Sequence, residues 1–168
     1  MRRLLPPLAA FAAAMLLLMW WYAGKVLIPA AGGLMPLDMR LLGFSAEAAQ
    51  AYVAALEGRG RAVYLLEMRW LDTGFMWSFA LLMALGLLRF SRGRSLWLRA
   101  LLLLPVAAYL GADWAEGVTV RELLLRGPEQ FLPLLAEWAA LFTRLKTGFA
   151  ALSLGLLARL WWLERRQG

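Results

Sequence analysis

The chain has 168 residues, of which 62% are hydrophobic and 17% are charged, whereas soluble domains carry roughly 45–50% apolar and about 25% charged residues. This composition and a mean hydropathy of +0.64 exclude an ordinary soluble domain and indicate an integral membrane protein. Because the chain has no His and no Cys, it lacks the usual ligands of haem, structural zinc and iron–sulfur clusters. We therefore expect no cofactor and no metal, and any chemistry must use carboxylates, Lys, hydroxyls or Tyr.

Four apolar segments, separated by charged residues, follow one another along the chain. None of them reaches the about 20 residues that a helix needs to cross ~30 Å of hydrocarbon, so each can span only by continuing through a charged residue. Helices are required because lipid offers backbone groups no hydrogen-bond partner. We predict an all-α fold, an integral membrane four-helix bundle in one domain (residues 1–168), with spans at about 8–29, 70–90, 97–119 and 136–160.

The segment from about 32 to 69 is the only sizeable stretch between predicted spans. Ser45 is a natural helix N-cap, and Gly58 suits the C′ position after a helix end. Apolar side chains recur between them with the helical spacing i, i+3, i+4, i+7, at Ala49, Tyr52, Val53 and Leu56. We expect one short amphipathic helix on the external side, which either lies on the membrane surface or caps the bundle.

The net charge of +7 resembles that of a nucleic-acid-binding protein, but its distribution indicates membrane topology instead. With the N-terminus, the turn at 89–99 and the C-terminus on one side, nine of the 18 basic residues accompany a single acid, Glu164. The positive-inside rule then places both termini in the cytoplasm of a cell with an inner (plasma) membrane, and we expect no nucleic-acid partner. The nine basic residues are Arg2, Arg3, Arg89, Arg92, Arg94, Arg99, Arg159, Arg165 and Arg166.

Charged residues also fall inside the predicted spans, where they are expensive unless they are paired. Asp113 and Lys146 lie 14 and 13 residues from Arg99 and Arg159, the basic residues at the cytoplasmic ends of their spans, so they share a depth. We predict a polar cluster in the outer half of the bundle, with Lys25 and Arg144 as further candidates. Its expected members are Asp72, Asp113, Glu116, Thr143 and Lys146.

Three interpretations of these charges remain open: side chains that snorkel to the membrane surface, an ion-pair network that fixes the helix register, or a site for a ligand, ion or proton. Apolar side chains on the same helix face as Asp72 are more typical of packing than of a cofactor pocket. Ser78 and Ser153 are expected to bond carbonyls of their own helices. The apolar side chains are Met68, Phe75, Met76, Phe79 and Met83.

Three stretches of the sequence resemble a family of small, uncharacterised bacterial membrane proteins with four spans. They are LGFSAEAAQAYVAALEGRGRAVYLLEMRWLD (42–72), ADWAEG (112–117) and LFTRLKTGF (141–149). The shared pattern is an Asp at the start of the second span, D-x-x-E on the third and T-x-x-K on the fourth. The resemblance implies that the five predicted cluster residues belong to one motif, and it implies no activity. Gly117 departs from the pattern, because it stands where the pattern has Asn.

Two functions remain open at this point. The leading hypothesis is a non-enzymatic binding or accessory protein that uses the polar cluster to bind a lipid, a small amphiphile or a partner subunit, with a homo-oligomer as a further option. The alternative is a small intramembrane enzyme or a proton-coupled carrier that uses the Asp/Glu/Lys cluster. An enzyme needs an open path for its substrate, whereas a structural or partner-binding cluster is expected to be charge-paired and closed to water. A nucleophile–base spacing is not recognisable, which favours the first hypothesis.

Overall fold

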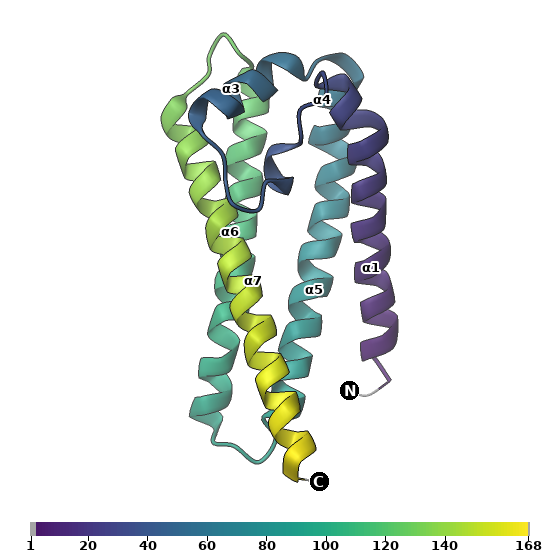
Figure 1. Cartoon of the computed structure of the whole chain (residues 1–168), viewed down its shortest axis with the longest axis vertical. Helices are drawn as coiled ribbons and strands as arrows, with labels where there is room; N and C mark the ends of the chain where they lie inside the picture. The colour runs from purple at the N-terminus through teal and green to yellow at the C-terminus, as the bar shows by residue number, and fades with distance from the viewer. Residues whose placement is uncertain (1–2, 168) are drawn as a thin grey trace.

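The computed structural model describes residues 3–167, and all regular secondary structure in that range is helical. Four long helical segments in this part of the chain lie side by side (Figure 1). Each is long and apolar enough to cross a membrane, which indicates an integral membrane protein. The segments are α1 (Leu5–Tyr22) with η1 (Ala23–Leu27) and α2 (Ile28–Ala30); α4 (Gly58–Val63) with η3 (Tyr64–Met68) and α5 (Arg69–Phe90); α6 (Leu96–Arg126); and α7 (Pro133–Gln167).

Short connections make α5, α6 and α7 successive antiparallel neighbours. α6 begins after Ser95, whose Oγ accepts a hydrogen bond from the Leu98 N–H at 3.4 Å. It ends at Gly127, whose φ of +71° favours glycine, and α7 begins at Pro133, where the missing N–H has no cost. The start of α1, the turn at 91–95 and the end of α7 share one end of the molecule, here named the terminal end; the opposite end is the loop end (Figure 1).

The predicted amphipathic helix is α3 (Ala46–Ala55), and it packs across the loop end of the long helices. Ser45 is its N-cap, because its Oγ accepts a hydrogen bond from the Ala48 N–H at 3.2 Å. The four apolar residues of the predicted stripe are fully buried, so α3 caps the helices. The prediction for Gly58 is wrong by position: Leu56 leaves the helix with extended backbone, and Gly58, with φ of +53°, begins α4 instead.

The chain between α2 and α3 re-enters the space between the long helices before it returns to the loop end (Figure 1). Its deepest part is a short 3-10 turn, η2 (Leu37–Met39), which packs against α6. Leu37 is fully buried there and joins the apolar core. The sequence analysis did not predict this path, which brings the residue after Leu37 among the helices.

Two groups of buried apolar side chains stabilise the fold. The first lies at the loop end and draws on all four long segments and α3; the second lies toward the terminal end between α5, α6 and α7. Along both α6 and α7, the buried polar residues stand between the residues of these two groups. The fold therefore holds a polar layer between two apolar cores. Representative core residues are Leu27, Tyr52, Met68, Leu123 and Ala139 for the first group, and Met76, Met83, Leu87, Val106 and Leu160 for the second.

Candidate functional site

Four of the predicted cluster residues meet where α6 faces α7. Asp113 and Glu116 are three residues apart and share one face of α6, and Thr143 and Lys146 have the same spacing on α7. The Lys146 Nζ lies 2.9 Å from Asp113 Oδ1 and also pairs with Glu116 Oε2, while the Thr143 hydroxyl donates to Glu116 Oε1. The side chains of Asp113, Glu116 and Lys146 are only 3%, 2% and 12% exposed. One ammonium group therefore serves two buried carboxylates.

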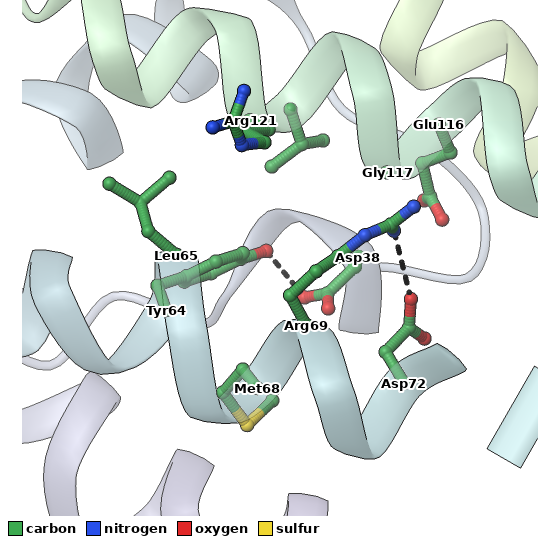
Figure 2. A pocket seen from close by; sticks show the side chains of 10 residues that line it. Asp38, Tyr64, Leu65, Met68, Arg69, Asp72, Glu116, Gly117 and Arg121 are labelled. Carbon is green, nitrogen blue, oxygen red and sulfur yellow. Dashed lines mark hydrogen bonds and ion pairs between the residues drawn. The ribbon is translucent and has the colours of Figure 1, made fainter. Parts of the chain in front are cut away.

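The fifth predicted residue, Asp72, lies near this group and pairs with Arg69 of the same helix. The Arg69 Nη1 is 3.4 Å from Asp72 Oδ2 (Figure 2). The guanidinium lies over the Trp114 ring, 5.3 Å from its centre. The same guanidinium occupies the space beside Gly117, where a Cβ would collide with it. A side chain at this position would require the flexible Arg69 side chain to move.

Asp38 is a site residue that the sequence analysis missed. The re-entrant turn η2 carries it between the helices, where its Oδ1 accepts a hydrogen bond of 2.7 Å from the Tyr64 hydroxyl (Figure 2). Burial raises the pKa of the Asp38 carboxyl above its ordinary value. In the sequence, Asp38 stands between two apolar residues, Leu37 and Met39, in the segment that follows Pro36. This pattern was the one indication that the acid could be buried.

A cavity of about 420 Å³ opens beside the cluster and reaches Asp38, Asp72, Asp113 and Lys146. From Lys146 it continues along α7 to Leu154, a distance of about 12 Å for eight residues of helix. Its remaining lining is largely apolar, and several of these side chains are also exposed on the outside of the molecule. The other lining residues are Leu16, Met19, Trp20, Met39, Leu41, Phe75, Phe79, Tyr109, Thr147, Ala150 and Ala151.

A second, much smaller space of about 30 Å³ lies between η3, α5 and α6 (Figure 2). It has room for about one or two water molecules. Asp38 and Asp72 line both this space and the large cavity, whereas Arg69 lines only the small one. The two carboxylates therefore stand between the two spaces.

The two further candidates lie outside this arrangement. Lys25 is exposed, and it does not line the large cavity. Arg144 is also exposed, and its Nε donates to the carbonyl of Ala140 at 3.2 Å, one turn earlier in α7. Neither side chain contacts the predicted cluster in the described structure.

The surrounding serines and the apolar stripe beside Asp72 lie as the sequence predicts. Ser78 Oγ donates to the Gly74 carbonyl at 2.7 Å, and Ser153 Oγ donates to the Phe149 carbonyl at 2.8 Å, as predicted. The three methionines of the stripe beside Asp72 pack in the apolar cores. Its two phenylalanines pack against the same cores and also line the large cavity.

The carboxylates do not form a metal site: across residues 3–167, no group of three or more His, Cys, Asp or Glu side chains is arranged to hold a metal ion. Comparison with protein-family models, curated proteins and solved structures gives no match to this chain. The four-span family pattern therefore stays a prediction, and the function must be argued from the site itself.

Proposed function

We propose that this membrane protein binds a small amphiphile. The polar group of the ligand lies at the buried charges, and its hydrocarbon part lies in the apolar part of the cavity that extends along α7. The observation that carries this proposal is the large cavity, which joins Asp72, Asp113 and Lys146 to a wall of apolar side chains. Ligand sites in proteins are typically cavities of about 300–1,000 Å³, mainly apolar, with a few polar groups that fix the orientation.

The apolar wall of the cavity supports an amphiphile rather than a small polar solute. Leu16 and Trp20 of α1 and Leu154 of α7 line the cavity and are also exposed on the outside of the molecule. In a membrane these exposed side chains face lipid, so a ligand dissolved in the bilayer can enter sideways without passing through water. A cavity of this kind also favours a small ligand over a partner subunit, which needs a continuous surface instead.

The proposal includes an orientation. The exposed basic residues of the turn at 91–95 and of the end of α7 lie at the terminal end, which supports placing that end in the cytoplasm of a bacterial inner membrane. Arg2 of the predicted basic set lies outside the described residues. In this orientation α3 is external, the four long segments form the membrane bundle, and the polar cluster occupies its outer half.

A second candidate, an intramembrane enzyme or a proton-coupled carrier, is favoured by one observation. The cluster is open to the cavity, so Asp72, Asp113 and Lys146 are accessible to a substrate, and this differs from the closed cluster expected of a purely structural network. Loss of a turnover reaction in Asp113→Asn, with the protein still folded, would decide for the enzyme.

Thermal unfolding of the purified chain tests amphiphile binding. In a detergent that is not itself a dodecyl amphiphile, dodecyl amphiphiles with different headgroups are added at a small mole fraction, and the melting temperature is recorded. A ligand that binds only the folded state raises it, because binding at 100 times the Kd stabilises by about 2.7 kcal/mol. For a chain of this length that corresponds to roughly 5–10 °C.

Two matched variants locate the binding site on α7. Ala151→Phe places a large ring in the lining of the cavity, whereas Ala158→Phe places the same ring at an exposed position outside the lining. We expect the stabilisation to disappear in Ala151→Phe and to persist in Ala158→Phe. Equal stabilisation of the two variants would contradict binding in this cavity.

A further inference from the structure

The charges around the large cavity do not balance. Three carboxylates line it, Asp38 from η2, Asp72 from α5 and Asp113 from α6, whereas Lys146 is the one cation among the described lining residues, which leaves a formal charge of two negative units. Uncompensated buried charge costs several kcal/mol per ion, so the site requires protons or a bound cation to neutralise it.

Lys146 in the lining and Arg69 outside it are both already engaged by carboxylates. Lys146 is the single basic residue among the described residues that line the large cavity, and its ammonium group is shared by Asp113 and Glu116. Arg69 contacts Asp72 only at 3.4 Å and lines the small space rather than the large cavity. A negatively charged headgroup would therefore meet an acidic wall with no available cation.

Three aromatic rings stand in the same part of the lining. Phe75 and Phe79 lie one turn and two turns after Asp72 on α5, stacked with their ring centres 5.5 Å apart. Tyr109, one turn before Asp113 on α6, meets Phe79 edge-on at 5.4 Å, and its hydroxyl is 3.5 Å from Asp113 Oδ2. Aromatic rings attract cations through their π faces, and combined with carboxylates they are typical of sites that recognise ammonium groups.

We infer that the amphiphile bound in this cavity carries a cationic headgroup of the alkylammonium class. Its ammonium group lies between Asp72, Asp113 and the aromatic rings, and its alkyl chain extends toward Leu154. The acid excess, the shared Lys146 and the position of the rings support this ligand over anionic and neutral amphiphiles of the same chain length. The inference rests on the proposed function, because it names the class of ligand for the same cavity.

Native mass spectrometry and thermal unfolding test the inference with three single-chain probes of equal length. The probes are dodecyltrimethylammonium, dodecanoate and dodecyl maltoside, each competed against the others on the detergent-solubilised protein. We expect a one-to-one adduct of dodecyltrimethylammonium that is at least about tenfold tighter than that of dodecanoate, because the interaction of a unit charge with the acidic wall changes sign between the two probes.

Two variants with the same change of charge test whether this preference arises in the cavity. Asp72→Asn and Glu137→Gln each remove one negative charge, but Glu137 is exposed on α7 and does not line the cavity. We expect Asp72→Asn to weaken dodecyltrimethylammonium binding at least about tenfold and Glu137→Gln to leave it unchanged. Phe79→Leu, which keeps an apolar side chain and removes a ring, should weaken it about three- to tenfold.

The outcomes separate this inference from the proposed function. If all three probes bind equally and Ala151→Phe abolishes their binding, the cavity binds amphiphiles and the cationic headgroup is wrong. If the preference for the cation is the same in Asp72→Asn as in Glu137→Gln, the inference is also overturned. If no probe binds the folded protein, the proposed function fails together with it.

Discussion

At the scale of single residues, Lys146 determines whether the polar layer can be buried. Its side chain is 12% exposed, and its ammonium group contacts Asp113 and Glu116, which are almost fully buried. Leaving one member of such a group without its partner costs about 3–5 kcal/mol, because the remaining charge stays away from water. Asp113 and Glu116 therefore depend on one side chain of the neighbouring helix.

The first prediction concerns this dependence. Lys146→Met should destabilise the folded protein by about 3–5 kcal/mol, because two carboxylates lose their only ammonium partner. Adding Asp113→Asn should recover part of the loss, with a coupling of ~1–3 kcal/mol, and the recovery stays incomplete while Glu116 keeps its charge. The measurement is a double-mutant cycle of unfolding free energies in detergent. Strictly additive losses would show that the pair does not interact.

At the scale of elements, the re-entrant turn η2 determines the composition of the site. It brings Asp38 against the Tyr64 hydroxyl, and Tyr64 itself lies in η3, a π-helical turn at the start of the second long segment. π-Helical turns are rare and frequently occur at functional sites, because the extra residue re-aims the side chains around it. The turn and the π-helical segment together place a third carboxylate in the lining of the large cavity, beside Asp72 and Asp113.

The second prediction uses the raised pKa of Asp38, which burial causes. From about pH 4 upward the unfolded chain loses this proton before the folded protein does, so the stabilisation present at low pH is lost as the pH rises through the raised pKa. Asp38→Asn keeps an oxygen acceptor for Tyr64 and should gain stability relative to the natural chain between pH 4 and pH 8. The charged and titratable groups around Asp38 are Arg40, Tyr52, Tyr64, Arg69, Asp72, Asp113, Glu116, Arg121 and Lys146.

Melting temperatures of both chains across this pH range provide the measurement, and Glu47→Gln provides a control of opposite sign. The hydrogen bond with Ser45 lowers the pKa of the Glu47 carboxyl, so its contribution is present at higher pH and is lost on acidification. Glu47→Gln should therefore lose stability relative to the natural chain as the pH rises. A pH-independent difference for Asp38→Asn would contradict the prediction.

Local signals in the sequence predicted the pairing of helices better than the path of the connecting segment. Asp113 and Lys146 could be predicted to lie at the same depth, because they are 14 and 13 residues from the basic residues that end their spans. The rise per residue of a helix is constant, so equal residue numbers correspond to equal depths. The burial of the apolar stripe of α3 could also be predicted from neighbouring residues, because it follows from their helical spacing. The position of Asp38 could not be predicted, because the path of residues 31–45 depends on the packing of Leu37 against the core. The spacing of apolar residues in the sequence does not predict such long-range packing.

At the scale of the whole molecule, charge is distributed unevenly along the long axis. The terminal end carries the basic turn at 91–95 and the basic end of α7, where Arg165 and Arg166 lie over the rings of Trp161 and Trp162 at 4.2 and 3.7 Å from their centres. Tryptophan and basic side chains are both enriched where a helix leaves the membrane on the cytoplasmic side. The loop end carries acids and bases together and offers no comparable bias.

The third prediction concerns orientation across the membrane. Reporter fusions at Arg92 and at residue 168 should both report a cytoplasmic location, and a fusion near Arg59 should report an external one, because the basic residues are retained on the cytoplasmic side. The chain has no Cys, so a single Cys at position 59 or 92 is its only thiol, and a membrane-impermeant maleimide should label intact cells only at position 59. Labelling at 92 but not at 59 would show that the protein has the opposite orientation in the membrane. The cavity would then open to the cytoplasmic leaflet. Because an amphiphile that enters sideways is drawn from the leaflet that the cavity faces, this experiment also decides which leaflet supplies the ligand.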